Sequence, residues 1–177
     1  MYVLLNGAFG VGKTTVARAL RGKLASATLF DPEWVGLALM RLPGYARSDF
    51  QHLSAWRRLS VLGARVFAAT REVVIIPMAF SELRYLDEVR SGLAASRRPV
   101  LHFCLTAPLD VVRARLAARG EPAGDPSWAW VHRRAEECCL AHAAPAFAVH
   151  VPTEDATPEA LAEQLAERIT ARSRHLK

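Results

Sequence analysis

Apolar and polar positions follow two different patterns along this chain. Short runs of mostly apolar residues lie at positions 3–6, 27–30, 73–77, 100–105 and 148–151. Longer segments, in which apolar residues recur every three or four positions, lie at 13–24, 32–39, 49–69, 81–94, 108–118, 127–141 and 158–172. The runs predict strands that are covered on both faces, and the longer segments predict helices. Their alternation predicts an α/β fold: a three-layer α/β/α sandwich built on a five-stranded parallel sheet.

The loop that follows the first run has the sequence NGAFGVGKTT, which contains the Walker A pattern G-x-x-x-x-G-K-T. Glycines let successive backbone N–H groups point at anionic oxygens, while the lysine reaches the β- and γ-phosphates and the first threonine ligates Mg²⁺. The motif predicts a P-loop NTPase fold that binds ATP and Mg²⁺, with Thr14 as the metal ligand. The predicted nucleotide-binding residues of the loop are Gly7, Ala8, Phe9, Gly10, Val11, Gly12, Lys13, Thr14 and Thr15. A glycine-rich turn that binds nothing is the alternative, and the predicted strand and helix on either side argue against it.

Composition and charge restrict the classes of protein. The 177 residues are 51% hydrophobic, so we expect residues 1–177 to form a single domain with a substantial core. No apolar run approaches the roughly 20 residues of a membrane span and no cleavable leader is evident, so we expect a cytoplasmic protein. The cysteines, Cys104, Cys138 and Cys139, lack zinc-site spacing and predict reduced thiols. The net charge of +6 suits nucleic acid or an anionic small ligand, and the scatter of the arginines favours the small ligand.

A carboxylate follows the second predicted strand, at the edge where ligands of an open parallel sheet bind. Asp31 opens the sequence D-P-E there. It can accept the proton of an attacking hydroxyl or hold Mg²⁺ through water, and it can equally cap the helix that begins at Pro32. The third run, V-V-I-I-P-M, has no acidic residue after it, which argues against a switch GTPase or a motor ATPase. Either Asp31 contributes to the metal site, or Thr14, phosphates and water hold the ion alone.

A proline- and glycine-rich loop, G-E-P-A-G-D-P, separates two predicted helices that carry arginines. We expect residues 120–127 to form a small mobile lid. A guanidinium on a closing lid can stabilise the charge of a phosphoryl group in transfer, and Arg119 at the lid edge is the best candidate. Arg115 is a second candidate for nucleotide binding, and Arg133 and Arg134 follow on the returning helix. Each arginine could instead lie on a solvated helix face, so the grouping around the loop is the informative feature.

Two further segments bear on ligands and surfaces. Residues 43–51 are polar and aromatic and lie on the predicted acceptor side, where Trp34 and Phe50 could stack on a ring system or simply pack in the core. The C-terminal segment has one apolar face and a basic end. It suits either a helix that covers the sheet or weak association with an anionic membrane surface.

Several motifs occur together and in order: N-G-A-F-G-V-G-K-T, D-P-E-W-V-G-L-A-L, D-F-Q, V-I-I-P-M and S-W-A. In this combination the chain, from Val3 to about Pro145, resembles the bacterial tunicamycin-resistance proteins, a family of small P-loop ATP-binding proteins. It is also similar to small-molecule kinases of the nucleoside-monophosphate, shikimate and chloramphenicol phosphotransferase kind. The resemblance implies that residues 7–15 bind the nucleotide, with Lys13 essential, and that Asp31 and Glu33 act on the acceptor side.

The motifs and the resemblance together predict an ATP-dependent phosphotransferase that confers tunicamycin resistance by modifying a hydroxyl of a nucleoside-type small molecule. The predicted catalytic residues are Lys13, Asp31 and Arg119. The residues expected to contact the acceptor are Asp31, Glu33, Trp34, Phe50, Gln51 and Arg133. The alternatives are an ATP-dependent protein that sequesters the drug unchanged, because the carboxylate after the third strand is missing, and a nucleotide or polynucleotide kinase, because the chain is basic. We expect a monomer or a homodimer.

Overall fold

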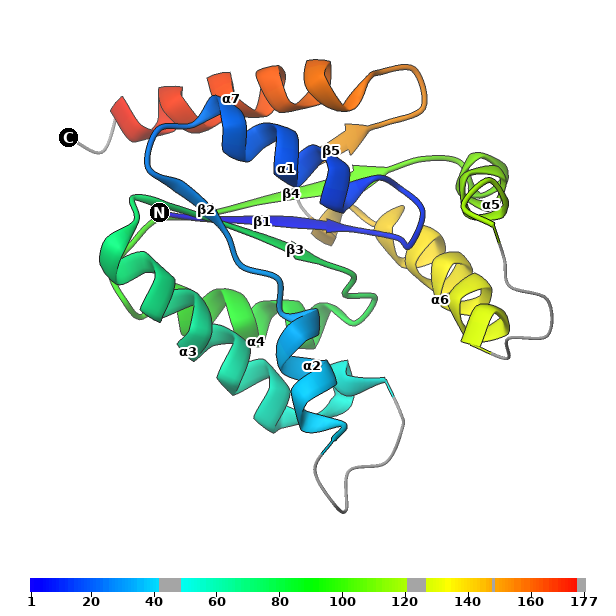
Figure 1. Cartoon of the computed structure of the whole chain (residues 1–177), viewed down its shortest axis with the longest axis horizontal. Helices are drawn as coiled ribbons and strands as arrows, with labels where there is room; N and C mark the ends of the chain where they lie inside the picture. Colours follow the sequence, from blue (N-terminus) through cyan, green and yellow to red (C-terminus); the bar gives the residue numbers. More distant parts are fainter. Residues whose placement is uncertain (42–48, 121–126, 148, 175–177) are drawn as a thin grey trace.

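Parallel strands form one five-stranded sheet in the computed structural model, which describes residues 1–41, 49–120, 127–147 and 149–174 (Figure 1). The strands are β1 (Tyr2–Gly7), β2 (Ala27–Leu29), β3 (Val73–Met78), β4 (Val100–Thr106) and β5 (Val149–Pro152). Their order in the sheet is β2-β3-β1-β4-β5, so the strand that leads into the Walker A loop lies at the centre. The predicted α/β fold with a five-stranded parallel sheet is confirmed.

Helices cover both faces of this sheet, as Figure 1 shows. One face carries α1 (Lys13–Lys23) and α7 (Pro158–Arg174), and the other carries α3 (Ser54–Thr70), α4 (Leu83–Ala94) and α6 (Ser127–His142). The shorter elements are α2 (Glu33–Leu39), α5 (Leu109–Ala117) and the 3-10 helices η1 (Phe50–His52) and η2 (Pro145–Phe147). The arrangement is the three-layer sandwich that the hydrophobic pattern predicts.

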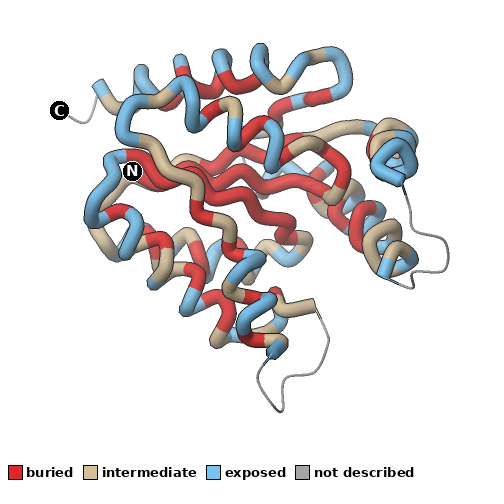
Figure 2. Tube along the Cα trace, in the orientation of Figure 1, coloured by how far each residue is buried: buried red, intermediate tan, exposed pale blue. Residues whose placement is uncertain are grey.

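Side chains of β1 point alternately to the two faces of the sheet, so this strand contributes to both hydrophobic cores. Val3 and Leu5 pack toward α1 and α7, whereas Tyr2 and Leu4 pack toward α3 and α4. All four are buried, and the central strands are buried along their length in Figure 2. Successive side chains of a strand point to opposite faces, so a strand between two helical layers must be apolar at every position.

The C-terminal helix covers the sheet. Leu161, Leu165 and Ile169 of α7 are buried in the same cluster as Val16 and Leu20 of α1. The apolar stripe of this segment is therefore occupied by packing inside the domain, as expected for a helix that covers the sheet. Across the parts of the chain that the structure describes, no helix has both the length and the apolar character needed to cross a bilayer.

Two helices start at least two residues later than predicted. The segment 49–69 is broken, because Leu53 is extended (φ −79°, ψ 114°) and separates η1 from α3. The segment 81–94 starts later, at Leu83, because Glu82 is also extended. The predicted lid falls almost entirely on residues 121–126, and most of the segment 43–51 falls on 43–48. Both stretches lie outside the described residues, so the lid stays a prediction.

Candidate active site

The Walker A loop leaves β1 and enters α1 with two glycines in the left-handed region. Gly10 has φ 83° and Gly12 has φ 102°, values that side chains rarely allow. A Cβ on Gly10 would lie 2.9 Å from Cγ of Leu116 and 3.0 Å from the carbonyl oxygen of Val112, because α5 rests directly on the loop. A Cβ on Gly12 would meet no atom within 4 Å. The backbone at Gly12 is therefore bare on its open side, as an anion-binding loop requires.

The side chain of Lys13, the first residue of α1, folds back toward the Walker A loop. Its Nζ donates a 2.8 Å hydrogen bond to the carbonyl oxygen of Ala8 and lies 5.3 Å from the centroid of the Phe9 ring. The side chain is buried, and burial lowers the pKa of its ammonium group. Among the described residues it forms no ion pair with a carboxylate. A buried cation whose only hydrogen-bond partner is a neutral carbonyl group is suited to a polyphosphate, which would supply the missing negative charge.

The N-terminus of α1 offers further donors to an anion. No side chain caps this helix, and its first turn contains no acidic residue. The first N–H groups of a helix have no partner within it, and they lie at the positive end of the helix dipole. Thr14 and Thr15 are exposed at this turn, so a hydroxyl is available to a hard cation such as Mg²⁺. The residues present thus fit a nucleotide with its metal ion.

A cavity of about 310 Å³ opens on the α7 side of the loop. It is lined by Gly10, Val11, Gly12, Thr15, Val16, Arg115, Arg119, Thr153, Ala156, Pro158 and Leu161. Both arginines that were predicted to bind the nucleotide therefore lie next to the loop. The cavity has the position and the size for the nucleoside end of a nucleotide whose phosphates occupy the loop.

Arg115 holds the loop in place. Its Nη1 donates to the Thr153 hydroxyl at 2.9 Å and to the Val11 carbonyl oxygen at 3.4 Å, and its Nη2 donates to the Thr153 carbonyl oxygen at 2.7 Å. The Thr153 hydroxyl also donates to the Val11 carbonyl oxygen. The guanidinium thus connects α5, the end of β5 and the Walker A loop, which is a positioning role that spacing along the sequence could not reveal.

The two acids of D-P-E face different cavities. Asp31 lines an open groove of about 400 Å³ together with Thr14, and its carboxylate accepts a 3.0 Å hydrogen bond from the backbone N–H of Glu33. Glu33 lines a second, narrow pocket on the other side of α2. Loss of solvation beside the neighbouring residues, followed by the negative charge of Asp31, raises the pKa of Glu33, although the residue as a whole is exposed. Among the described residues no group of three histidine, cysteine or acidic side chains could hold a metal alone. A cation here would therefore need phosphate and water ligands.

The narrow pocket has a free volume of only about 20 Å³ and is largely aromatic. It is lined by Phe9, Pro32, Glu33, Phe50, Gln51, Trp56, Pro77, Met78, Ala79 and Trp130. The structure thus brings together Glu33, Phe50 and Gln51, all predicted on the acceptor side, and places them beside the Walker A loop. Trp34 is not among these residues: it is 73% exposed and lines the groove of Asp31 instead.

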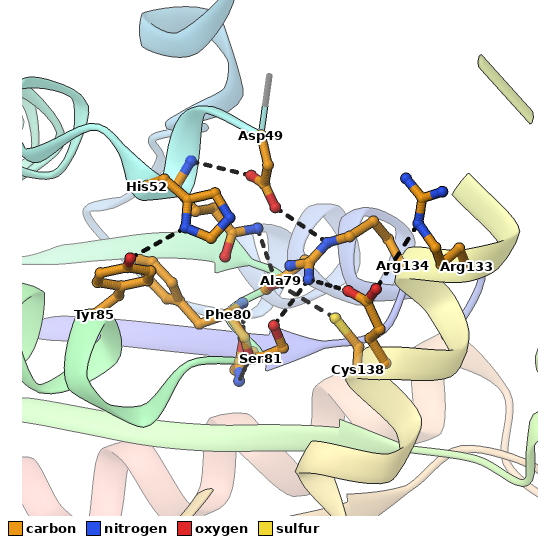
Figure 3. Close-up of polar contacts among 12 residues, drawn as sticks. Asp49, His52, Ala79, Phe80, Ser81, Tyr85, Arg133, Arg134 and Cys138 are labelled. Atoms are coloured by element: carbon orange, nitrogen blue, oxygen red, sulfur yellow. Dashed lines mark hydrogen bonds and ion pairs between the residues drawn. The ribbon is translucent and has the colours of Figure 1, made fainter. Parts of the chain in front are cut away.

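Arg133 and Arg134 have different surroundings, which Figure 3 shows. The side chain of Arg133 is 66% exposed, and its Nε lies 3.9 Å from a carboxylate oxygen of Glu137. The side chain of Arg134 is only 9% exposed, and its Nε lies 3.1 Å from the equally buried carboxylate of Asp49. Sequence reasoning named both arginines near the predicted lid but assigned the acceptor contact to Arg133 alone. The spacing of Trp130 and Arg134, one helical turn apart, is the signal that could have indicated the buried arginine.

Comparison with known proteins identifies the family. A family model described as an AAA domain matches residues 3–137. The chain belongs to this family. A search of curated protein sequences finds no match for this AAA-domain protein.

Solved structures similar to this AAA-domain protein include the tunicamycin resistance protein of Deinococcus radiodurans. The two chains are 29% identical, with a TM-score of 0.77 over 95% of this chain and 94% of that one. A gluconokinase from Sinorhizobium meliloti 1021 is 17% identical, with a TM-score of 0.65 over 97% of each chain. A shikimate kinase from Acinetobacter baumannii, in complex with shikimate, is 16% identical, with a TM-score of 0.59 over 97% of this chain and 93% of that one. The resemblance to tunicamycin-resistance proteins is confirmed, and the kinases share the fold.

Proposed function

We propose that this protein is an ATP-dependent phosphotransferase that moves the γ-phosphoryl group to a hydroxyl of a tunicamycin-like acceptor. The observation that carries the proposal is the position of Phe9, whose ring lies under the Lys13 ammonium and also lines the pocket of Glu33. The end of a bound triphosphate and the acceptor would therefore meet at one residue. The similarity to the tunicamycin resistance protein of Deinococcus radiodurans supports the choice of acceptor.

In this proposal the loop and the acids divide the work. The ammonium of Lys13 and the first N–H groups of α1 would bind the β- and γ-phosphates, and Thr14 would help to hold a Mg²⁺ ion, which would supply charge neutralisation when bound. Glu33 takes the proton of the acceptor hydroxyl, since its raised pKa suits a general base and it lines the pocket beside Phe9 that the hydroxyl group would enter. The acceptor oxygen bonds to the γ-phosphorus as the bond to the β–γ bridging oxygen breaks, and ADP leaves with that electron pair.

Asp31 and Arg119 have supporting roles. Asp31 shares a groove with Thr14, which supports a role for its carboxylate on the metal side, and its hydrogen bond from the backbone N–H of Glu33 would help to orient the base. Arg119 lines the nucleotide cavity next to Thr15, from where it can approach the phosphates. These roles refine the sequence-based hypothesis, in which Asp31 was the candidate base.

The test is to incubate the purified protein with Mg-ATP and tunicamycin and to measure the mass of the recovered drug. We expect a gain of one phosphoryl group. The gain should be lost in Lys13→Ala and retained in Lys23→Ala, because Lys23 is an exposed lysine of the same helix that pairs with Glu163. Drug that is retained in the presence of ATP but recovered unchanged would contradict phosphoryl transfer and indicate sequestration.

A further inference from the structure

The narrow pocket that Glu33 lines is called the acceptor pocket below, and none of its described lining residues carries a positive charge. Its described lining residues include one acid, Glu33, and one amide, Gln51, while the remaining ones are apolar or aromatic and none is lysine or arginine. The indole N–H of Trp56 is already donated to the Pro32 carbonyl oxygen at 2.9 Å. Because the free volume is only about 20 Å³, a single group of the acceptor could enter, and it would meet aromatic surface, an amide and a carboxylate.

An arginine nevertheless lies directly beside the pocket. Arg134 is one turn after Trp130 on α6, so both side chains lie on the same side of that helix. The partners of Arg134 flank pocket residues: Ser81 is two residues after Ala79, and Asp49 is two residues before Gln51. In Figure 3 the guanidinium points from α6 toward this group.

The Arg134 guanidinium already interacts with two carboxylates and a hydroxyl. Its Nε lies 3.1 Å from Oδ2 of Asp49, and its Nη1 donates to Oε2 of Glu137 at 2.6 Å and to the Ser81 hydroxyl at 2.9 Å. Glu137 also lies 3.9 Å from Nε of Arg133, so two arginines face two acids and the cluster has no positive charge to spare. Burial makes this neutralisation strong, because solvent screens the Arg134–Asp49 pair poorly.

The same cluster also shapes the pocket. Oδ1 of Asp49 accepts a 3.0 Å hydrogen bond from the backbone N–H of Gln51, and the side-chain amide of Gln51 donates to the Ala79 carbonyl oxygen at 3.0 Å. The ion pair between Asp49 and Arg134 therefore holds η1, which contains Gln51, against α6. Charge and shape at this end of the pocket depend on one buried arrangement.

We propose that the acceptor pocket selects an uncharged, hydroxyl-bearing acceptor and rejects carboxylated or phosphorylated ones, because Asp49 and Glu137 occupy the arginine that an anionic acceptor would need. The inference rests on the proposed phosphotransferase activity. An anionic group in the pocket would find no free cation among the described lining residues and would face the carboxylate of Glu33. An uncharged acceptor meets no such repulsion.

The first test compares acceptors that differ by a single anionic group. ADP release by the wild-type protein is measured with Mg-ATP and tunicamycin, uridine or UMP, and methyl shikimate or shikimate. We expect turnover with tunicamycin, and in each pair kcat/KM should be at least about tenfold higher for the uncharged member. Preferred turnover of UMP or shikimate would overturn this inference and leave the phosphotransferase proposal standing. Absence of turnover with every acceptor, tunicamycin included, would overturn both.

The second test releases the arginine. In the double variant Asp49→Asn and Glu137→Gln both carboxylates are lost, while an asparagine can still accept the hydrogen bond from the N–H of Gln51. The preference for the uncharged member should then fall by about tenfold or reverse. The matched control is Glu136→Gln, which removes an exposed acid that pairs with Arg113 on the outer side of α6. An unchanged preference in a folded double variant would contradict the proposal, and the wild-type comparison decides if the variant does not fold.

Discussion

Asp31 and Glu33 are joined by a 3.0 Å hydrogen bond from the backbone N–H of Glu33 to the carboxylate of Asp31, yet the two carboxylates face different cavities. A single turn at the start of α2 therefore separates an acid that shares a groove with Thr14 from an acid that lines the narrow aromatic pocket. The charge of the first influences the proton affinity of the second, because Asp31 is one of the causes that raise the pKa of Glu33.

This coupling predicts a shift in the pH profile. Only the ionised form of Glu33 can take a proton, so kcat should increase as pH rises through its raised pKa, above the ordinary value of 4.5. Asp31→Asn removes a neighbouring negative charge, so the pKa of Glu33 should fall and the acidic limb should move to lower pH. Glu33→Gln should lower kcat by about 10²-fold or more and abolish the limb. An acidic limb that stays in place in Asp31→Asn would contradict the electrostatic coupling.

The Arg115 contacts predict a loss of nucleotide affinity without a loss of fold. Arg115→Ala removes one hydrogen bond from each of the carbonyl oxygens of Val11 and Thr153, so the Walker A loop should hold its shape less well and KM for ATP should rise by about tenfold. Arg115→Lys should restore little, because an ammonium cannot reproduce the fork of two nitrogens. Arg113→Ala, which removes an exposed ion pair on the same helix, is the control and should leave KM unchanged. Equal KM values in all variants would show that the contacts do not shape the loop.

The glycines of the loop should respond differently to the same substitution. Gly10→Ala combines a positive φ with close contacts to Leu116 and Val112, so it should lower the free energy of unfolding by about 2–3 kcal/mol. In Gly12→Ala the positive φ is unfavourable but the added Cβ meets no atom, so the free energy of unfolding should fall by about 1 kcal/mol. ATP binding should weaken more strongly than in Gly10→Ala. Gly22→Ala, in α1 with open space around it, should be neutral or slightly stabilising. Thermal unfolding and ATP titration of the three variants would separate the effects on stability and on binding. Similar losses of ATP binding in Gly12→Ala and Gly22→Ala would contradict a phosphate-binding role for the backbone at Gly12.

A buried histidine predicts acid sensitivity of the whole fold. His102 on β4 has no hydrogen-bond partner for either ring nitrogen among the described residues. Burial, helped by the charges of Arg90, His142 and His150, lowers its pKa from 6.5 to about 4. Because the unfolded chain takes up the proton first, stability is full above pH 6.5 and is lost as pH falls toward 4.

This site should contribute roughly 2 kcal/mol to the loss of stability between pH 7.5 and pH 5. His102→Leu should remove that part of the loss, leaving the part due to His142, whose pKa is also lowered to about 4. Urea denaturation at the two pH values measures it, with the exposed His52→Gln as the control. An unchanged pH dependence in His102→Leu would show that His102 is not a source of the acid sensitivity.

The sheet was predictable because each strand is a short apolar run and each run is followed by a helical pattern. The Walker A loop was predictable because its chemistry depends on residues adjacent in sequence. Pairing across the fold was not predictable: Arg134 and Asp49 are far apart in sequence, and only the packing of η1 against α6 brings them together. Arg133 carries the same charge one position earlier, and the difference between them is the face of the helix on which each lies.

The acids show the same limit at shorter range. D-P-E placed two carboxylates at the end of β2, but their spacing could not tell which one faces the acceptor. Trp34 was assigned to the pocket because it is aromatic and close to Asp31, and the direction of its side chain at the start of α2 instead leaves it exposed in the groove. Arg115 matched its expected position but binds backbone oxygens, so its role depends on the end of β5.

The packing of α7 on α1 has a consequence for the time order of folding. The helix that leads from the Walker A loop is made early, but the side chains that bury its apolar face, Leu161, Leu165 and Ile169, are translated more than a hundred residues later. Contacts of such long sequence separation form slowly and late. A ribosome-bound chain that already contains the whole Walker A motif would therefore still lack a stable phosphate-binding end until its last helix docks.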